Sequence, residues 1–331
     1  MVPKILVTGR LPDDVLSVLA ERFEVESQKE DRPMERRRLL DAIGDREGLL
    51  CMITDSIDAE LLSHAPRLKM IANMGVGYNN IDVRAATARS IPVSNTPGVL
   101  TEATADLAFT LLLAIARRVV EGDRRVRAGE FTFWAPFLFL GREVSGKTLG
   151  VIGMGRIGKA VAQRARGFDM PVIYHNRSRI EPAEEDRLGV KYETLEELLR
   201  KSDFVSLHVP LMAETRHLIG RREIGLMKPS AYLINTSRGP VVDEQALLAA
   251  LQAGQIAGAA LDVYEHEPSL TPGLTLLDNV ILLPHVGSAT LETRTRMAAM
   301  AAQNLIAGLS GQKPPNLVNP EVFSSENAPP P

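Results

Sequence analysis

One segment constrains the fold of this chain more than any other. The apolar run Thr148–Ile152 is typical of a buried strand, it leads into Gly-Met-Gly-Arg-Ile-Gly at positions 153–158, and a helical pattern follows from Lys159 to Gly167. A glycine loop between a strand and a helix is the arrangement that binds the pyrophosphate of a dinucleotide. The same glycine spacing also occurs in ordinary turns, so the prediction depends on the strand and helix that flank it.

Each glycine of this loop has its own physical reason. Gly153 permits the tight turn, Gly155 lets the backbone approach a pyrophosphate, and Gly158 lets the helix pack closely on the strand. The N-terminus of the helix offers free N–H groups and the positive end of its dipole to the phosphates.

Composition sets the outer limits. The chain of 331 residues is long enough for two domains, and 45% hydrophobic with 24% charged residues is typical of a soluble globular protein. The net charge of −3 gives no reason to expect nucleic acid or a membrane surface as a partner. The N-terminus reads as a strand rather than a signal peptide and no apolar run has membrane-spanning length, so we expect a cytoplasmic protein. The single cysteine, Cys51, lies in an apolar run and is expected to be a buried thiol.

Short apolar runs alternate with helical patterns along the chain, which is typical of parallel α/β sheets. In the first unit we expect strands at Lys4–Thr8, Phe23–Glu26, Gly48–Ile53, Leu68–Asn73 and Pro92–Ser94, with helices at Asp13–Arg22 and Met34–Ile43. In the second unit we expect six strands, at Thr148–Ile152, Val172–His175, Phe204–His208, Tyr232–Asn235, Ala259–Asp262 and Val280–Leu283. A helix predicted over Leu291–Leu309 has no strand after it and could return to the first unit.

The region between the two units holds an unusual aromatic segment. Thr101–Val120 has apolar residues at helical spacing and is predicted to be one long helix, whereas Glu121–Ser145 breaks that pattern. The second stretch contains Trp134, the only tryptophan, and four of the nine phenylalanines. We expect it to be covered, either by its own domain or by a second subunit, and we favour a dimerisation arm over about 121–145 and therefore a homodimer.

The residues after the second strand of the nucleotide-binding unit indicate the cofactor. The position that commonly carries an acid for the ribose hydroxyls is Asn176 here, and Arg177, Ser178 and Arg179 follow it. A carboxylate would repel a 2′-phosphate, whereas two arginines and a serine can donate to one. We therefore predict a preference for NADPH over NADH, and the alternative is that these arginines are only solvated and the enzyme uses both.

Three further runs follow predicted strands of the same unit, where α/β enzymes carry their working groups. They are Asn235-Thr236-Ser237-Arg238-Gly239-Pro240, Leu261-Asp262-Val263-Tyr264-Glu265-His266-Glu267-Pro268 and Leu283-Pro284-His285-Val286-Gly287-Ser288-Ala289-Thr290. Together with the glycine loop they make the chain resemble the D-isomer-specific 2-hydroxyacid dehydrogenases, from its start to about Pro320. Within that family it is most similar to the glyoxylate/hydroxypyruvate reductases, because of residues 176–179 and Phe133-Trp134-Ala135-Pro136.

The resemblance implies a fold and a domain organisation. A Rossmann dinucleotide-binding domain, residues 100–285, would be inserted into a flavodoxin-like substrate-binding domain formed by residues 1–99 and 286–331. Both would be doubly wound parallel-sheet domains, with the active site in the cleft between them. The polar, proline-rich tail, residues 322–331, is expected to be disordered.

The resemblance also implies catalytic roles that the chemistry of these residues suits. Arg238 would clamp the carboxylate and keto oxygen of a 2-keto acid, since a planar guanidinium binds two oxygens at once. His285 would be the general acid for the keto oxygen. Glu267 would hold His285 and raise its pKa, so that the imidazole stays protonated near neutrality. The product is a D-2-hydroxy acid, and no metal ion is expected.

The resemblance assigns binding roles as well. The turn Met74–Asn80 would offer the N–H groups of Val76 and Gly77 to the substrate carboxylate, Leu100 would border the substrate, and Trp134 would reach the neighbouring subunit's site. Asp262 would contact the nicotinamide amide or support the site, and His208 would line the cofactor cleft with its backbone, whereas Glu265 and His266 would be solvated. The cofactor contacts are expected from Thr104, Gly153, Gly155, Arg156, Ile157, Gly158, Asn176, Arg177, Ser178, Arg179, His208, Val209, Pro210, Thr215, Thr236, Ser237, Arg238, Asp262, His285 and Gly287.

Several functions are compatible with this fold. The one that the resemblance favours is NADPH-dependent reduction of glyoxylate and hydroxypyruvate, with 2-ketogluconate as a further substrate. Oxidation of phosphoglycerate or phosphite is the main alternative, but Asn176 does not suit these NAD-linked reactions. Formate oxidation is disfavoured because that branch has an amide in place of Glu267. A nucleotide-sensing corepressor is a different class, and nothing in the sequence resembles a peptide-binding or DNA-binding element.

Overall fold

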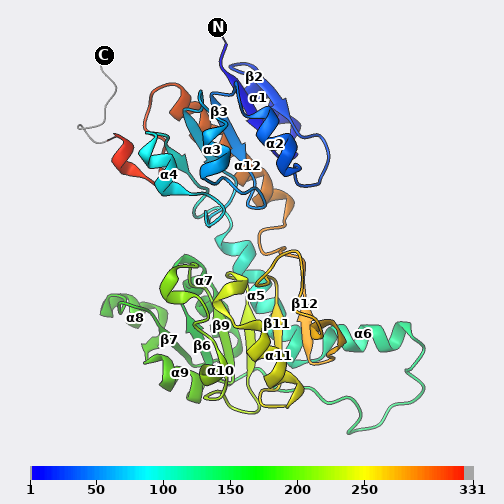
Figure 1. The fold of residues 1–331 in the computed structure, drawn as a ribbon. Helices are drawn as coiled ribbons and strands as arrows, with labels where there is room; N and C mark the ends of the chain where they lie inside the picture. The colour runs from blue at the N-terminus through cyan, green and yellow to red at the C-terminus, as the bar shows by residue number, and fades with distance from the viewer. Residues whose placement is uncertain (1, 324–331) are drawn as a thin grey trace. The chain divides into compact units, whose positions relative to one another are not determined.

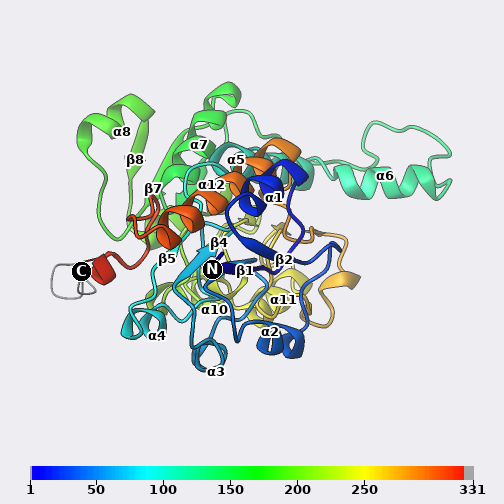
Figure 2. The same ribbon diagram turned by 90° about the horizontal axis from the view of Figure 1, so that it is seen from above.

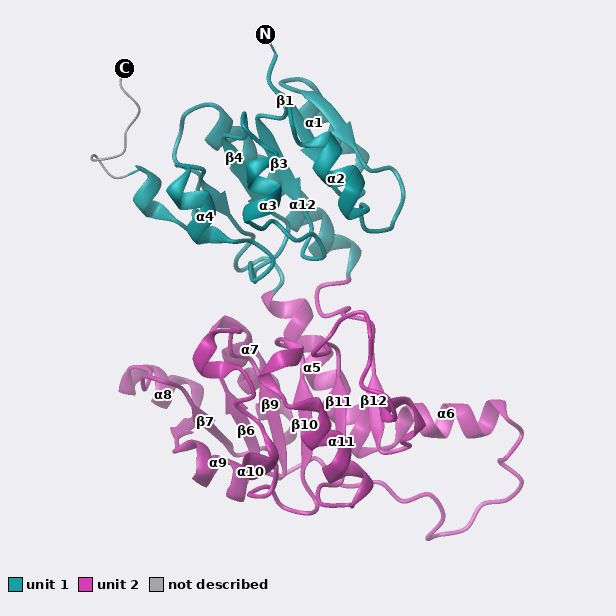
Figure 3. Cartoon of the chain, in the orientation of Figure 1, with its two compact units in different colours: residues 1–100, 290–331 teal, residues 101–289 magenta. Residues whose placement is uncertain are grey.

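The computed structural model describes residues 2–323, which form two compact units, residues 2–100 with 290–323 and residues 101–289 (Figure 3). The predicted tail lies outside the described residues from 324 onwards. Val322 and Phe323, which we had included in that tail, belong instead to the short 3-10 helix Pro320–Phe323, where Val322 is buried.

Unit 1 is a five-stranded parallel sheet with the order β2-β1-β3-β4-β5 (Figure 1), the flavodoxin-like arrangement. The central strands are buried along their whole length, because helices cover both faces. One face packs on α1 and α12, the other on α2, α3 and α4. The elements of unit 1 are β1 (Lys4–Val7), α1 (Asp13–Ala20), β2 (Glu24–Ser27), α2 (Arg36–Ala42), β3 (Gly48–Cys51), α3 (Ala59–Ser63), β4 (Met70–Asn73), α4 (Val83–Ala88), β5 (Val93–Ser94) and α12 (Leu291–Leu309).

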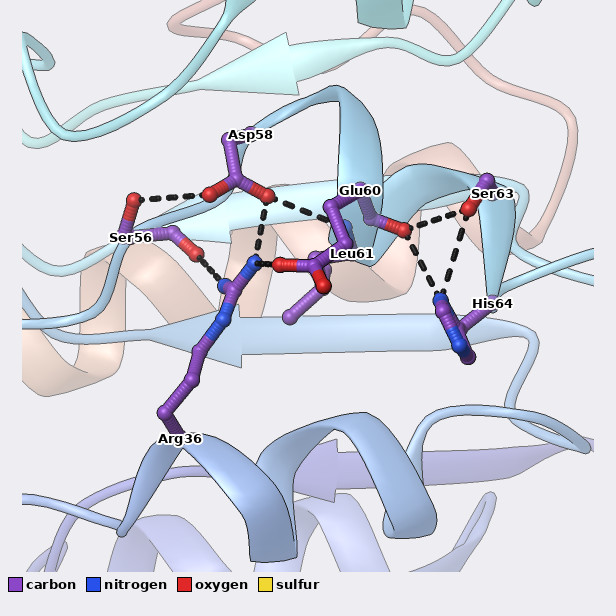
Figure 4. A network of polar contacts seen from close by, with 7 residues as sticks. All are labelled: Arg36, Ser56, Asp58, Glu60, Leu61, Ser63 and His64. Atoms are coloured by element: carbon purple, nitrogen blue, oxygen red, sulfur yellow. Dashed lines mark hydrogen bonds and ion pairs between the residues drawn. The ribbon is translucent and has the colours of Figure 1, made fainter.

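Polar contacts also link neighbouring helices of unit 1. Arg36, the first residue of α2, donates to the backbone oxygen of Ser56 and to the carboxylates of Asp58 and Glu60 at the start of α3 (Figure 4). Asp58 is also the N-cap of α3, since its side chain accepts the N–H of Leu61. One arginine therefore fixes the start of α3 relative to α2.

Unit 2 is a seven-stranded parallel sheet with the order β12-β11-β10-β9-β6-β7-β8. In chain order within the unit this is 7-6-5-4-1-2-3, the Rossmann arrangement with one added strand. The elements are α5 (Thr101–Ala116), α6 (Val119–Arg127), β6 (Leu149–Ile152), α7 (Arg156–Ala165), β7 (Val172–His175), α8 (Pro182–Leu188), β8 (Val190–Tyr192), α9 (Leu195–Lys201), β9 (Phe204–Leu207), α10 (Arg221–Ile224), β10 (Tyr232–Asn235), α11 (Glu244–Gln252), β11 (Gly258–Leu261) and β12 (Val280–Leu282).

Two predictions about unit 2 were wrong. The sheet has a seventh strand, β8, which the sequence does not reveal because it is three residues long and its middle residue, Lys191, is exposed. The predicted helix Thr101–Val120 is two helices, since Arg118 has a positive φ of 54° between α5 and α6. The segment expected to break the helical pattern at Glu121 is helical as far as Arg127, and no residue of α6 is buried.

The arm that follows is strongly apolar and open. Figures 1 and 2 both show α6 and the chain after it reaching away from the rest of unit 2. Trp134 is 76% exposed and Phe137 is 85% exposed. The arm therefore exposes far more aromatic surface than a folded-back loop would. Its other exposed apolar residues are Val119, Val126, Phe131, Phe133, Leu138 and Leu140.

Cys51 is buried, as expected, and burial raises the pKa of its thiol well above the usual value. No helix within residues 2–323 combines the length and the apolar character that crossing a membrane requires.

Candidate functional site

The glycine loop of unit 2 joins β6 to α7 at the point where the strand order reverses. Gly153 has a φ of +100°, and a Cβ added there would lie 2.6 Å from the carbonyl carbon of His208 at the end of β9. A Cβ on Gly158 would lie 2.2 Å from the Gly153 oxygen. A Cβ on Gly155, the N-cap of α7, would meet nothing within 4 Å. Two glycines are thus required by close packing, and the third faces open space beside the first turn of a helix whose N–H groups have no intrahelical partner.

Two buried polar atoms without a partner lie at the ends of the neighbouring strands. Within residues 2–323, His208 Nδ1 and Thr236 Oγ1 are buried and make no hydrogen bond. His208 is paired through Nε2 with Ser206 Oγ at 2.8 Å, and burial lowers its pKa to about 4, so the ring is neutral. Buried polar atoms are nearly always satisfied, so these two fit a polar ligand at this edge of the sheet. The open glycine loop and these atoms suit a dinucleotide.

The four residues predicted to select the cofactor follow β7, and they have different environments. Asn176 Oδ1 accepts the N–H of Met154 at 2.7 Å and so braces the glycine loop. Arg177 and Ser178 are exposed, and their side chains make no hydrogen bond or ion pair within residues 2–323. Arg179, by contrast, forms a two-point ion pair with Glu185 of α8. The sequence predicted Arg177, Ser178 and Arg179 as donors to a 2′-phosphate without distinguishing the two arginines, and the structure gives these arginines different partners.

A second group of residues at the strand ends of unit 2 pairs His285, which follows β12, with Glu267, which follows β11. His285 Nδ1 lies 2.8 Å from Glu267 Oε2, and the other carboxylate oxygen accepts the N–H of Tyr264 at 2.9 Å. Burial alone would raise the pKa of Glu267. The hydrogen bond and charge of His285, the Tyr264 N–H and the charge of Arg238 outweigh burial and hold that pKa below its usual value. Glu267 is therefore ionised at neutral pH.

Arg238 follows β10 in the same unit. Its guanidinium donates to the backbone oxygen of Ser237 at 2.7 Å. Burial lowers the pKa of Arg238 and the charge of Glu267 opposes that effect, and an arginine remains protonated throughout the physiological range. The next residue, Gly239, cannot carry a side chain, since a Cβ there would lie 1.8 Å from the carbonyl carbon of Tyr264. The turn that contains Arg238 and Gly239 therefore packs directly against the loop that carries Glu267.

Asp262 supports the histidine loop. Its two carboxylate oxygens accept the N–H groups of Val286 and Gly287, both at 2.7 Å. His285 itself has a φ of +54°, which a residue with a side chain adopts at a cost of about 1–2 kcal/mol. Asp262 was expected either to contact the nicotinamide amide or to support the site. This geometry fits support of the site, because Asp262 holds the backbone immediately after the strained His285. Thr104, predicted to touch the cofactor, lies on α5 beside Gly287.

Several residues of this region were not recognised from the sequence. Tyr264 Oη donates to the Leu283 oxygen at 2.8 Å and so ties the glutamate loop to the histidine loop. Glu244 is buried and accepts the Glu265 N–H and the Thr271 hydroxyl. The expectation that Glu265 is solvated was wrong, because its side chain is only 10% exposed and lies 2.6 Å from His217 Nε2. His266 is exposed.

The remaining predicted cofactor contacts lie on the same strand ends and their loops. Ser237 is held by Asn235 Oδ1, which accepts both its N–H and its hydroxyl. Thr215 Oγ1 donates to the Pro210 oxygen at 2.7 Å and closes the loop after β9 that also contains Val209. Arg156 and Ile157 form the first turn of α7, and Arg156 is exposed.

In unit 1, the turn Met74–Asn80 follows β4 and shows how its N–H groups are oriented. Gly75 O accepts the Thr96 N–H at 3.0 Å, Val76 O accepts Asn95 Nδ2 at 2.8 Å, and Gly77 O accepts Asn73 Nδ2 at 2.9 Å. The C=O and N–H of one trans peptide point in opposite directions. Three consecutive carbonyls tied back in this way turn the next three N–H groups, those of Val76, Gly77 and Tyr78, away from the braces.

These three N–H groups make no hydrogen bond within the described residues. Successive free N–H groups form a concavity that binds anions. The sequence indicated the two donors Val76 and Gly77 but not the side chains that orient them, Asn73 and Asn95. Leu100, the other predicted residue of this unit, packs against its core.

Comparison with known proteins places this geometry in a family. Residues 109–287 match the family described as D-isomer specific 2-hydroxyacid dehydrogenase, NAD binding domain. This chain belongs to the D-isomer-specific 2-hydroxyacid dehydrogenases. It is therefore an NAD(P)-dependent oxidoreductase that takes a nicotinamide cofactor, and its resemblance to the glyoxylate reductases is confirmed by the full-length relatives.

Three relatives illustrate how closely the family matches. The glyoxylate reductase of Thermococcus litoralis is 52% identical over 329 residues, which cover 98% of this chain and 99% of the relative. The crystal structure of a glyoxylate reductase from Paecilomyes thermophila matches with a TM-score of 0.86 and 37% identity, covering 97% and 100% of the two chains. An NADPH-dependent glyoxylate/hydroxypyruvate reductase from Sinorhizobium meliloti, in complex with NADP and malonate, matches with a TM-score of 0.84 and 36% identity, covering 96% and 97%.

Proposed function

We propose that this enzyme reduces glyoxylate and hydroxypyruvate to the corresponding D-2-hydroxy acids with NADPH, and that 2-ketogluconate is a further substrate to test. The observation that carries the proposal is the pair His285–Glu267 at 2.8 Å, together with the partly buried Arg238 on the neighbouring strand end. The full-length similarity to proteins named glyoxylate reductase supports the substrate class.

His285 would be the general acid. With Nδ1 bound to the ionised Glu267, the imidazole can hold a proton on Nε2 and deliver it to the keto oxygen. The cofactor, when bound, supplies the hydride to the carbonyl carbon, so the π bond of the carbonyl is replaced by new C–H and O–H bonds and the C–O single bond remains. The charge that remains on the imidazole–carboxylate pair is −1, and a solvent proton restores the acid.

Arg238 and the turn Met74–Asn80 would bind the substrate. A guanidinium can donate to a carboxylate oxygen and to the keto oxygen together, and its charge would polarise the carbonyl toward the transition state. The outward N–H groups of Val76 and Gly77 suit a small carboxylate. Leu100 would border the substrate, where its size would limit the side chains that a keto acid can carry.

The preference for NADPH is supported by the loop after β7. The position of this loop that commonly carries an acid is occupied by Asn176, and Arg177 and Ser178 are exposed donors. The glycine loop would hold the pyrophosphate, with His208 Nδ1 and Thr236 Oγ1 as further polar contacts for the cofactor. NADH remains usable in this proposal, because nothing at this loop repels a free ribose.

We also propose that the enzyme is a homodimer that uses the arm. Trp134 and the three exposed residues Phe137, Leu138 and Leu140 after it would be covered by a second copy, and Trp134 would reach that copy's substrate site. Trp134→Ala should then change KM for hydroxypyruvate, or the preference for it over glyoxylate, while the dimer persists. Unchanged kinetics with an intact dimer would argue against this role.

One panel of assays tests the proposed reaction. Oxidation of NADPH and of NADH is followed with glyoxylate, hydroxypyruvate, 2-ketogluconate and pyruvate, and we expect turnover of about 1 s⁻¹ or more for the first two. His285→Ala should lower kcat by roughly 10²–10⁴-fold. Turnover of phosphoglycerate, phosphite or formate, or the absence of any turnover together with tight nucleotide binding, would replace the proposal with one of the alternatives.

A further inference from the structure

The loop after β7 carries two arginines, and only one of them has an uncompensated charge. Arg179 Nε lies 2.7 Å from Glu185 Oε1, and its terminal nitrogen lies 2.5 Å from Oε2. This is a bidentate pair, which holds a guanidinium in one orientation. Arg177, two residues earlier, makes no ion pair within the described residues and is exposed. The local charge of the loop is therefore close to +1 and not +2.

Glu185 is fixed by more than this arginine. Its side chain is 7% exposed, and Oε1 also accepts the hydroxyl of Tyr174, a fully buried residue of β7. Tyr174 Oη in turn accepts the N–H of Ile180 at 3.1 Å, so the carboxylate is linked to both ends of the loop. Strand, loop and helix α8 are joined through one carboxylate. Arg179 and Tyr174 lower the pKa of Glu185 to about 2, so it keeps its negative charge at neutral pH.

We propose that Glu185 sets the cofactor specificity of this enzyme by neutralising Arg179, so that Arg177 with Ser178 discriminates for the 2′-phosphate. The inference rests on the proposed use of NADPH and goes beyond it, because it assigns unequal roles to two arginines that look alike in sequence. Glu185 is a positioning residue: it acts through Arg179. Its charge limits the preference for NADPH and leaves room for NADH.

The test uses two ligands that differ only in the 2′-phosphate. Adenosine 2′,5′-bisphosphate and 5′-AMP are titrated calorimetrically into the full-length protein, and the ratio of their Kd values isolates the 2′-phosphate contribution. Losses that affect the shared adenosine and 5′-phosphate cancel in this ratio. The measurement needs no turnover, so it is independent of substrate and of catalytic damage.

Four variants give distinct results under the proposal. Arg177→Ala should reduce the preference for the bisphosphate by about tenfold or more, because it removes a charge-assisted contact. Glu185→Gln should increase it by roughly three- to tenfold, since Arg179 is released from its counter-charge. The double variant Arg179→Ala with Glu185→Gln removes a neutral pair and should stay within about threefold of the wild type. Glu193→Gln is the matched control: Glu193 is equally charged and 12% exposed, but it pairs with Lys191 and Lys201 outside the loop, and it should change nothing.

The outcomes separate this inference from the proposed function. If the wild type binds the bisphosphate no more tightly than 5′-AMP, the proposed NADPH preference fails, whatever the variants do. If the preference exists but Glu185→Gln leaves it unchanged, neutralisation of Arg179 does not control the preference and the proposal is overturned. If the double variant loses as much of the preference as Arg177→Ala, Arg179 is a direct ligand and the proposal is equally overturned. Glu185→Gln alone decides the matter if the double variant does not fold.

Discussion

The two units each leave backbone N–H groups of one loop without a partner within the described residues, and they orient these groups by different means. In unit 2 the glycine loop relies on backbone conformation: Gly153 has a φ of +100° and lies against the His208 carbonyl, and the donors belong to the first turn of α7. In unit 1 the turn Met74–Asn80 relies on side chains, since Asn73 and Asn95 donate to the carbonyl oxygens of Gly77 and Val76 and so turn the N–H groups that follow outward. The first site is sensitive to a Cβ added at Gly153 or Gly158. The second is sensitive to the chemistry of two amides.

This difference predicts the largest effect for an alanine in the glycine loop. Gly153→Ala introduces a left-handed alanine and a clash with backbone, so we expect a loss of about 2–4 kcal/mol in the free energy of unfolding. Affinity for NADPH should fall by at least about 100-fold, because the loop must move away from β9. Urea unfolding and calorimetric titration measure the two quantities.

Gly75→Ala is the matched substitution in unit 1. Its Cβ would lie 2.4 Å from Ile53 Cγ2, a side-chain atom, and Gly75 has no positive φ. A side chain can rotate away, whereas backbone cannot, so the loss of stability should be smaller than for Gly153→Ala and NADPH binding should be unchanged. Equal losses at the two glycines would show that the units do not differ in this respect.

The second effect in size concerns the asparagine braces. Asn95→Asp cannot donate to the Val76 oxygen and adds a negative charge beside the turn, so the N–H of Gly77 is no longer held outward. We expect KM for glyoxylate to rise about tenfold or more with a smaller change in kcat, as for a group that binds the substrate and transition state alike. Steady-state kinetics with saturating NADPH measure this.

Asn80→Ala is the control for Asn95→Asp. Asn80 Nδ2 donates to the Met52 and Asp55 carbonyls at 3.1 Å and makes a longer contact of 3.5 Å with Asn73 Oδ1, but it donates to none of the carbonyls of Gly75, Val76 and Gly77. The Asn80→Ala substitution should lower the free energy of unfolding about as much as Asn95→Asp does and leave KM close to the wild-type value. A rise in KM equal to that of Asn95→Asp would mean that general loosening of the turn, and not the orientation of one peptide, governs substrate binding.

The sequence predicted most of the elements compared here, but not the contacts that orient their N–H groups. Eleven strands were located within about two residues of their ends, because a buried strand between two helical layers is a continuous apolar run. The glycine loop and the pair His285–Glu267 were recognised because their residues stand in short, specific runs. Strand β8 was missed because three residues at a sheet edge leave no such run.

What could not be predicted are contacts between residues that no pattern connects. Asn95 and Val76 are 19 positions apart, and His217 and Glu265 are 48 positions apart. Arg179 and Glu185 are only six apart, but an exposed arginine in a loop reads the same whether it is free or paired. Whether a polar side chain binds a ligand or braces the backbone depends on partners that only folding brings together.

The smallest expected effect is a pH dependence of opposite sign in the two units. The pKa of Glu185 is lowered to about 2 by Arg179 and Tyr174, so its stabilising contribution is complete above the unfolded-state value and is lost as the pH falls toward 2. Asp55, beside the turn of unit 1, has a pKa raised by burial, and the bonds from Thr8 and the Met52 N–H only partly offset this. It is therefore stabilising when protonated, and stability decreases as the pH rises through that raised pKa.

Urea unfolding of two variants between about pH 3 and pH 6 measures these opposite pH dependences of the free energy of unfolding. The stability lost in Glu185→Gln should shrink on acidification to roughly half or less of its value at neutral pH, because the wild type loses the same ion pair. The stability of Asp55→Asn relative to the wild type should instead improve as the pH rises, since asparagine has no charge to bury. Parallel pH profiles for both variants would show that the two carboxylates are equally solvated, and would remove the electrostatic part of the contrast between the units.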